Sequence, residues 1–503
     1  MEDQLIHLLA ETQSPTDSRK HAERQIESLY TTLGFPTSLA SIASHDSVPL
    51  NIRQSALLVL KTFVQAAWSP QFEEFKGQVL VGEEEKTRLR HMLIELATGN
   101  IEERKIKSAA SYVVSKIASA DFPEQWPDLL PTLLQVVQTG TDAQLHGALK
   151  VLVELVDDGF EQDQFFVVAR DLIRAIYDIA SNPQRKPTLR ALAVSVFRAC
   201  FDILETVMED HKAAVKQFAD EALNAWVPFF IDILKSKLPA PMTEEQEQAD
   251  PAAAEVIRGT IALKLQVVKV LMRIRSTFPS NITNQSPVLF SATWDELSSL
   301  QQAYHDMFID ENRQSRLEDA DGLPYTLDFL VLEELDFMQA CLRATPVRKE
   351  LEQQLKTTNG SDSSWVTAVM KLAVGYAQIT SEEEGLWNID VNIFLSEETS
   401  VTANYTPRTA CGDLVIKLSE WLRSATIDGL LSYTRTLYST EQSWKAKEAA
   451  LFVLNQLLND EVNETIPPET ATNFVDFIRY AMQQDDEFLR ARGYLVAGSL
   501  TRA

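Results

Sequence analysis

Apolar residues in this chain recur every three or four positions over stretches of three or more turns, and short polar or proline-containing breaks separate these stretches. From Asn51 to Trp68 the apolar positions Ile52, Ala56 and Val59 follow this spacing, which predicts a helix buried on a wide face. Further helices of this kind, with small residues beside an aliphatic stripe, are predicted at 103–118, 144–156, 188–207, 256–277 and 444–451.

Second amphipathic helices are predicted between the first ones, at 85–97, 126–138, 162–180, 214–235, 294–308, 365–379 and 470–482. Neither member of such a pair can bury its apolar face alone, so the pairs must stack. Equivalent positions recur at intervals of roughly 54, 38 and 45 residues, and later of roughly 39 and 44. These positions are Ala56, Ala110, Ala148 and Ala193, then Ala410, Ala449 and Gly493. We therefore predict an all-α fold, a HEAT-repeat α-solenoid in which antiparallel helix pairs form a superhelix.

A proline-rich joint separates two of the predicted helices at Phe122–Pro131. Pro123 and Pro127 lack a backbone N–H and disfavour the helical conformation of the residues before them, so the incoming helix must end by about Ala120. Trp126 lies between these prolines, and Trp-Ser-Pro at 68–70 and Trp-Val-Pro at 226–228 resemble this arrangement. We expect each tryptophan ring to pack against a neighbouring layer.

Four segments interrupt the regular spacing, and we interpret them as linkers or insertions. They cover residues 238–253, 279–293, 357–364 and 381–407. The fourth begins with an acidic run followed by Trp387, and we expect it to be a flexible acidic loop. The chain stops at Ala503 inside a predicted helix whose partner is missing, so we expect the sequence to be a fragment, because a solenoid normally ends in a polar capping helix.

The chain is strongly acidic, with 72 Asp and Glu against 46 Lys and Arg and a formal net charge of -26. This charge repels nucleic acid and anionic lipid, and a basic protein is its natural partner. An acidic surface also keeps a large protein in solution, so charge alone leaves both interpretations open. The mean hydropathy of -0.13 is that of a globular protein rather than a membrane protein or a disordered one.

The residue types that support catalysis are scattered along the sequence. The seven histidines form no group with cysteine, serine or aspartate at a spacing that would place two on one helix face. Glycine-rich phosphate loops are absent as well. The three cysteines are far apart and are expected to be buried and reduced, and the N-terminus has no secretory signal. We predict a soluble intracellular protein that is not an enzyme and needs no cofactor or metal.

The motifs described above resemble those of the importin-β family of nuclear transport receptors, the karyopherins. Residues 19–26, followed by 52–61 and Trp68, are similar to the N-terminal domain of that family. The joint at 122–129 resembles the hinge in the third repeat of many importins and exportins. The resemblance extends over nearly the whole chain, and implies the N-terminal half of a receptor of about twice this length.

The acidic segment 381–407 resembles an insertion of the importin-nine subgroup, whose members carry core histones and the TATA-binding protein into the nucleus. This sequence has fewer acidic residues there than the subgroup form, and a neutral stretch at 400–404. The resemblance implies a division into N-terminal Ran-binding repeats at 1–120, HEAT repeats at 121–380, the insertion at 381–407 and further HEAT repeats at 408–503. The partners that the resemblance implies are Ran-GTP, basic cargo proteins and the Phe-Gly repeats of the nuclear pore. It implies no direct binding to nucleic acid or to a membrane. The receptor would shuttle between cytoplasm and nucleus.

The family also implies where Ran-GTP binds. Its acidic loop contacts Ran, a role that falls here on Glu382, Glu383, Glu384, Trp387 and Asp390. Second helices of the first repeats line the inner face, and on 85–97 the polar positions that share a helix face are Arg88, His91 and Glu95. A solvated acidic loop and ordinary helix-surface polarity explain the same residues without a partner.

Basic cargo is expected to meet two acidic groups, each of which is also explained by solubility alone. The groups are Glu154, Asp157, Asp158, Glu161 and Asp163, and Glu333, Glu334 and Asp336. Asp157 and Asp158 lie at a helix C-terminus, where carboxylates oppose the helix dipole and so do not stabilise the helix. Two alternatives remain: an exportin of the same family, and a HEAT-repeat scaffold outside nuclear transport.

Overall fold

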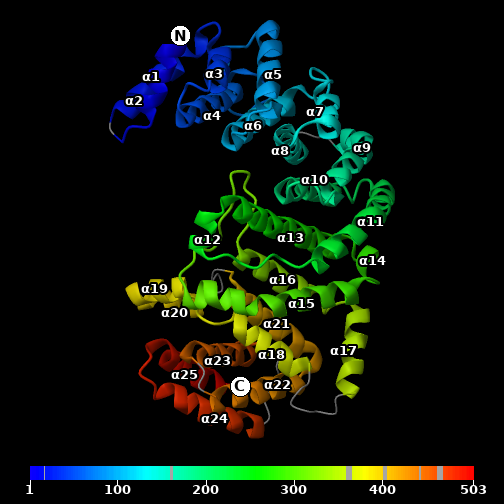
Figure 1. Cartoon of the computed structure of the whole chain (residues 1–503), viewed down its shortest axis with the longest axis vertical. Helices are drawn as coiled ribbons and strands as arrows, with labels where there is room; N and C mark the ends of the chain where they lie inside the picture. The colour runs from blue at the N-terminus through cyan, green and yellow to red at the C-terminus, as the bar shows by residue number, and fades with distance from the viewer. Residues whose placement is uncertain are drawn as a thin grey trace. The chain divides into compact units, whose positions relative to one another are not determined.

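The computed structural model describes residues 1–15, 17–158, 162–357, 365–399, 405–440, 443–460 and 468–502. These residues form 25 α-helices and no β-strand, arranged as antiparallel pairs (Figure 1), so the predicted HEAT-repeat α-solenoid is confirmed. None of the described helices combines the length and the apolarity that a bilayer crossing requires. The chain divides into two compact units.

Unit 1 comprises Met1–Trp226, Arg258–Gln266 and Glu318–Leu323. Its helices are α1 (Glu2–Thr12), α2 (Ser18–Ser28), α3 (Phe35–Ser44), α4 (Leu50–Ala67), α5 (Glu83–Thr98), α6 (Arg104–Asp121), α7 (Leu129–Thr139), α8 (Asp142–Asp158), α9 (Gln162–Ser181) and α10 (Pro187–Thr206). Each odd-numbered helix packs on the even-numbered helix that follows it, and α4, α6, α8 and α10 also pack side by side in a row. In this pairing α5 is the first helix and α6 the second, which corrects the sequence analysis, where 85–97 was counted as a second helix. We call the even-numbered members the second helices of the repeats.

Close packing within unit 1 depends on a glycine in α8. A Cβ atom at Gly147 would lie 1.7 Å from the main-chain oxygen of Ala97 at the end of α5, far inside van der Waals contact. Any larger side chain would therefore force α5 and α8 apart.

Unit 2 comprises Val227–Ile257, Val267–Leu317 and Pro324–Ala503. Its helices are α12 (Glu244–Ala249), α14 (Pro279–Ile282), α15 (Ser286–Tyr304), α16 (Leu327–Cys341), α17 (Thr345–Thr357), α18 (Trp365–Tyr376), α19 (Ser381–Ile389), α20 (Val391–Thr399), α21 (Pro407–Leu422), α22 (Ser424–Ser439), α23 (Trp444–Asn459), α24 (Pro468–Met482) and α25 (Glu487–Leu500). The helices α11 (Lys212–Lys235) and α13 (Pro251–Thr277) contribute residues to both units. Here α16, α21, α23 and α25 form the row of second helices.

Two of the predicted linkers contain helices instead. The segment 279–293 was expected to be irregular, but it forms α14 and the start of α15. Pro279 and Pro287 occupy the first turn of these helices, where proline costs no hydrogen bond and its fixed φ favours the helix. In 238–253, Thr243 and Gln246 form a reciprocal cap at the start of α12. Most of 357–364 lies outside the described residues.

Candidate functional site

The proline-rich joint encloses a buried carboxylate. Asp121, the last residue of α6, accepts hydrogen bonds from Trp68 Nε1 at 2.9 Å and from Arg90 Nε at 2.9 Å. The Arg90 guanidinium lies 5.7 Å from the ring centroid of Trp68 and 5.8 Å from that of Trp126, distances typical of cation–π contacts. Trp68 and Trp126 are buried, as expected for rings that pack between layers, so the joint holds adjacent repeats together.

The polar stripe on α5 is exposed in unit 1. Arg88, His91 and Glu95 are all exposed, and their spacing of three and four residues places them on one face of the helix. The opposite face of α5 buries Leu89 and Leu93. These three side chains therefore form a surface that a partner can reach.

The acidic segment of unit 2 is helical rather than a flexible loop, which corrects the prediction for 381–399; residues 400–404 lie outside the described part. Thr380 caps α19, accepting from the backbone N–H of Glu383, while the Glu383 carboxylate accepts from the backbone N–H of Thr380 at 2.9 Å. Three acidic residues in the first turn, Glu382 to Glu384, also complement the helix dipole. Burial raises the pKa of Glu383, an effect that the nearby Arg408 opposes.

The other carboxylates of α19 differ in how accessible they are. Glu382 is exposed and accepts a hydrogen bond from Ser315 at 2.7 Å, and Asp390, after the helix, is exposed as well. Glu384 is half-buried and forms an ion pair with Lys445 at 2.7 Å. Part of the acidic run is therefore neutralised within the chain.

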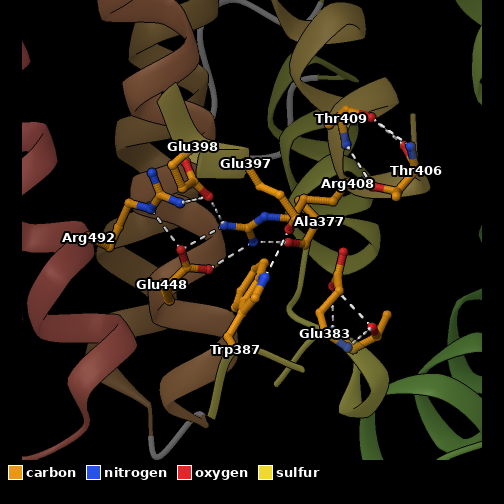
Figure 2. A network of polar contacts seen from close by, with 11 residues as sticks. Ala377, Glu383, Trp387, Glu397, Glu398, Thr406, Arg408, Thr409, Glu448 and Arg492 are labelled. Carbon is orange, nitrogen blue, oxygen red and sulfur yellow. Dashed lines mark hydrogen bonds and ion pairs between the residues drawn. The ribbon is translucent and has the colours of Figure 1, made fainter. Parts of the chain in front are cut away.

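Trp387 is buried, which contradicts its expected role as an exposed anchor for a partner. Its ring lies 5.0 Å from Phe394 and 5.6 Å from Phe488, centroid to centroid. Its Nε1 donates to Glu397 Oε2 at 2.9 Å (Figure 2). Trp387 thus attaches α19 to α20 and α25.

A buried network of four charged residues holds α20 against the row of second helices (Figure 2). Arg408 of α21 donates to both carboxylate oxygens of Glu448 on α23, at 2.9 and 2.7 Å. Arg492 of α25 donates to Glu448 Oε1 at 2.7 Å and pairs with Glu398 of α20, which also lies 3.4 Å from Arg408. Two cations and two anions balance one another, so burial costs less than it would for an unpaired charge.

The pKa values in this network reflect the pairing. Burial by itself lowers the pKa of Arg408, but the carboxylates of Glu448 and Glu398 outweigh burial and raise it. Burial by itself raises the pKa of Glu398, but Arg492 and Arg408 outweigh burial and lower it. Arg408 and Glu398 therefore stay charged at neutral pH.

An acidic cavity of about 530 Å³ adjoins this network. Its described lining residues include six acidic side chains, Asp328, Glu382, Glu383, Glu397, Glu398 and Asp413, and three arginines, Arg313, Arg316 and Arg408. The excess of carboxylates makes the cavity suited to a cationic side chain rather than to an anion.

The first acidic group predicted for cargo is only partly described. Glu154 is half-buried and forms an ion pair with Lys150 at 2.9 Å, whereas Asp157 is exposed. Glu161 and the side chains of Asp158 and Asp163 lie outside the described residues.

The second group, on α16, is less accessible than the sequence suggested. Glu334 is fully buried, because it lies one turn from Leu330 and Met338 on the apolar face of the helix. Glu333 is half-buried and lies 3.6 Å from Lys269. Asp336 accepts a hydrogen bond from the Tyr405 hydroxyl at 2.5 Å, and burial raises the pKa of Asp336 to about 6.

One group of potential metal-ligating residues was not recognised in the sequence. His305, Asp306 and Asp310 lie on a π-helical turn and bring one ligand atom each within 4.8 Å of one another. A spacing of five residues aligns side chains on a π-turn but not on the α-helix that the sequence predicted. His305 Nδ1 lies 3.3 Å from Asp310 Oδ2, so the group forms its own ion pair when the imidazole is protonated.

Models of three known families match successive parts of the chain. The importin-β N-terminal domain matches residues 22–98, an exportin 1-like protein matches 103–235, and the importin-9 central HEAT repeats match 360–503. Importin subunit beta-5 of Schizosaccharomyces pombe is 25% identical over 463 residues, which cover 90% of this chain and 44% of the relative. Importin-9 of Drosophila melanogaster is 20% identical over 466 residues, which cover 89% of this chain and 42% of the relative.

The chain belongs to the importin-β family. The karyopherins are transport receptors rather than enzymes. This member spans less than half the length of those two relatives.

Solved karyopherin structures share the fold. The exportin Cse1 in its cargo-free, cytoplasmic state aligns with a TM-score of 0.65 at 15% identity, over 100% of this chain and 52% of that one. Kap95 in complex with Nup1 aligns with a TM-score of 0.57 at 13% identity, over 99% of this chain and 51% of that one. Kap95p aligns with a TM-score of 0.50 at 13% identity, over 99% of this chain and 61% of that one. Binding of Kap95p induces the switch loops of RanGDP to adopt the GTP-bound conformation.

The charged network of this karyopherin is a feature that sequence analysis did not find. Arg408, Glu448 and Arg492 lie in helices that read as ordinary amphipathic segments, and their burial depends on how successive repeats align. Glu448 follows Arg408 by 40 residues and Arg492 follows Glu448 by 44, about one repeat each time. This periodic spacing of opposite charges was the signal available in the sequence.

Proposed function

We propose that this importin-β family member is a nuclear import receptor that carries basic cargo, of the histone or TATA-binding protein type, from the cytoplasm to the nucleus. The observation that carries the proposal is the match of residues 360–503 to importin-9 central HEAT repeats, in the part of the chain that holds α19, α20 and most of the lining of the acidic cavity. In this role the chain binds cargo and Ran-GTP and performs no catalysis.

Cargo binding is supported by the distribution of charge. The chain carries a net charge of -26, and the described lining of its cavity has twice as many carboxylates as guanidinium groups. Glu382 at this cavity and Asp157 in unit 1 are exposed, so lysine and arginine side chains of a cargo can reach them. Covering the charge of a basic cargo in this way would reduce its adhesion to nucleic acid.

Ran-GTP binding is proposed for the exposed face of α5, with Arg88, His91 and Glu95, and for Glu382 and Asp390 at the two ends of α19. The α5 face lies within the segment that matches the importin-β N-terminal domain, and the structural neighbour Kap95p binds Ran. Trp387, being buried, would contribute by holding α19 in place rather than by touching Ran. The complex of Kap95 with Nup1 supports a nuclear-pore protein as a further partner.

The proposed cycle uses the flexibility of stacked repeats. Ran-GTP bound to the first repeats would change the curvature of the stack by small adjustments at many interfaces, and so weaken the hold on cargo. A ligand can shift such an equilibrium only through a difference in affinity between its two states.

The test is equilibrium binding of the chain to Ran loaded with a non-hydrolysable GTP analogue or with GDP. We expect at least about tenfold tighter binding to the GTP form. Equal affinities would overturn the proposal, as would a complete lack of Ran binding, which is the result that a HEAT-repeat scaffold outside nuclear transport would give.

An exportin is the second candidate, because the exportin 1-like model matches residues 103–235 and Cse1 is a structural neighbour. Import and export differ in the sign of the coupling between Ran-GTP and cargo. An exportin would bind cargo more tightly in the presence of Ran-GTP, and an import receptor more weakly.

A further inference from the structure

The row of second helices in unit 1 contains a polar cluster that none of the proposed functions uses. Asp321 belongs to the short segment Glu318–Leu323, which we call the acidic tip and which packs within unit 1. Asp321 Oδ1 accepts a hydrogen bond from Ser108 of α6 at 2.7 Å, and Oδ2 lies 2.6 Å from Nε2 of His146 on α8. Lys150 Nζ donates to the main-chain oxygen of Asp321 at 3.0 Å.

The three groups that hold Asp321 form a built site, which we call the cradle. Ser108, His146 and Lys150 are 6%, 5% and 4% exposed. His146 and Lys150 are one turn apart on α8, so they project from the same face toward α6. Burial raises the pKa of Asp321, but His146, Ser108 and Lys150 outweigh burial and lower it, so the carboxyl group is held as an anion.

The α6 side of the cradle is basic although the whole chain is acidic. On the α8 side, Lys150 also forms an ion pair with Glu154 at 2.9 Å. Along its length α6 carries Arg104, Lys105, Lys107 and Lys116 against a single acidic residue, Asp121. Lys150 and Lys61 both lie over the ring of Tyr112, at 5.2 and 5.4 Å from its centroid. A basic surface of this kind attracts a carboxylate-bearing segment.

The acidic tip behaves as a preformed ligand rather than as part of a hydrophobic core. Its turn is closed internally, because Asp319 Oδ1 accepts from the backbone N–H groups of Asp321 and Leu323, both at 2.9 Å. Gly322 adopts φ +77°, a conformation that glycine reaches without strain. Asp321 and Leu323 are buried while Glu318, Ala320 and Gly322 are exposed, so the tip docks through two side chains.

A second contact of the same type occurs in unit 2. There Glu398, from the inserted helix α20, is held by Arg408 and Arg492 of the second helices α21 and α25. Ser108 and His146 are 38 residues apart in sequence, as expected for corresponding positions in consecutive repeats. In both units, then, the row of second helices binds a carboxylate that is delivered by an inserted segment.

We propose that the Ser108–His146–Lys150 cradle is a binding site for an acidic protein segment, and that the acidic tip occupies it in cis and so excludes a partner. The matching ligand is a tight turn that presents one aspartate, followed two residues later by an apolar side chain, as the tip does with Asp321 and Leu323. Such a partner gains access only when the tip is displaced. This site does not depend on the proposed transport function.

The acidic tip competes strongly with a free partner because it belongs to the same chain as the cradle. A segment attached to its own site has an effective concentration on the order of millimolar. A free peptide with an intrinsic affinity of about 10 μM would therefore bind the closed chain roughly a hundredfold more weakly than the open one.

The experiment uses the full chain and a fluorescently labelled peptide with the sequence of residues 316–325, with binding measured by fluorescence anisotropy. We expect Asp321→Ala, which removes the side-chain contacts with Ser108 and His146, to bind the peptide at least about tenfold more tightly than the unchanged chain. A peptide carrying D321N should bind weakly to every form, and Asp321→Ala combined with His146→Ala should not bind.

A second variant covers the case in which Asp321→Ala does not fold. Asp319→Ala removes the acceptor that closes the turn but leaves the cradle and Asp321 intact, and it should also increase peptide binding. Hydrogen exchange of residues 316–326 reports whether the tip has been released. The proposal is overturned if the released variants bind the peptide no better than the unchanged chain, or if the D321N peptide binds equally well.

Discussion

Arg408 and Glu448 form a bidentate ion pair between α21 and α23 in which the Glu448 side chain has no exposure to solvent. The two residues are one repeat apart, and Arg492, one repeat further, completes an Arg–Glu–Arg series along the row of second helices. Glu398 of α20 supplies the second anion. Because α20 packs against α19, which carries Glu382 and is followed by Asp390, this series helps to determine where these two proposed partner-binding residues lie.

Removal of the central carboxylate should destabilise unit 2 strongly. Glu448→Ala leaves Arg408 and Arg492 buried with one anion instead of two, which costs about 3–5 kcal/mol of unfolding free energy. Replacement of the pair by apolar residues, as in Arg408→Met with Glu448→Leu, should cost less than the single change, because no unpaired charge is left. Denaturant unfolding measures both effects, and a single variant as stable as the unchanged chain would contradict the structure of the network.

Trp387 and Ile389 form a matched pair for testing how α19 is attached. Trp387→Ala should lower the unfolding free energy by about 3–5 kcal/mol, because the ring is buried against Phe394 and Phe488. Ile389 on the same helix is 85% exposed, so Ile389→Ala should change stability by no more than about 0.5 kcal/mol. Hydrogen exchange should show loss of protection in α19 and α20 for the first variant. Equal effects of the two changes would mean that Trp387 is not buried.

The carboxyl group of Asp336 should make stability depend on pH between about 4 and 6. Burial raises its pKa in the folded protein to about 6, above the value of about 3.9 for an unfolded chain, so the folded state binds more protons in this interval. Stability contributed by this group therefore increases as the pH falls from 6 to 4. Because Asp336 is only half-buried, solvent screening limits the gain to about 1 kcal/mol.

The variant Asp336→Asn isolates this contribution from those of other carboxyl groups. It should equal or exceed the unchanged chain in stability at pH 7 and lose that advantage at pH 4, as measured by unfolding at both values. Tyr405→Phe removes the hydrogen bond to Asp336 without removing the carboxyl group, and serves as the control. A stability difference that does not vary with pH would show that the pKa of Asp336 is unshifted.

The exposed face of α5 can be tested without disturbing the fold. Arg88→Glu reverses a charge beside His91 and should weaken the binding of Ran-GTP by about tenfold, or about 1.4 kcal/mol, while leaving the unfolding free energy nearly unchanged. Arg174→Glu on α9 is the control, because Arg174 is also exposed and the substitution reverses the same charge outside the predicted Ran-binding repeats. If both changes weaken binding equally, the effect is one of net charge and not of the α5 face.

The architecture could be predicted from the sequence because it depends on local periodicity. Helix pairs about forty residues apart must stack to bury their apolar faces, whatever the details of each interface. The joint at Trp126 could be predicted for the same reason, since two prolines restrict the backbone locally. The participation of Arg90 and Asp121 could not, because these residues meet only when α5 and α6 pack.

Errors arose where a local signal was given the wrong weight. The acidic run at Glu382 was interpreted as a flexible loop, although Thr380 and Glu383 already had the spacing of a helix cap. The segment 279–293 was interpreted as a linker, but its Pro279 and Pro287 lie in the first turns of helices. The burial of Glu334 follows from its position on the apolar stripe of α16.

The contacts made by inserted segments were beyond sequence analysis. Asp321 and His146 are 175 residues apart in the chain, and no periodicity links a short turn to a helix so distant. Glu398 reaches its two arginines only because α20 folds back on the row of second helices. Such pairs depend on the alignment of whole repeats, and the loose repeat spacing does not define this alignment.

The central claim is that the chain releases, or loosens its hold on, basic cargo when Ran-GTP binds. The most direct test is a titration of Ran-GTP into a complex of the chain with a labelled core histone pair, followed by fluorescence anisotropy, with Ran-GDP as the control. The proposal predicts that Ran-GTP weakens histone binding by about fivefold or more while Ran-GDP has no effect. Histone binding that is unchanged by Ran-GTP, or tightened by it, would contradict a role in import.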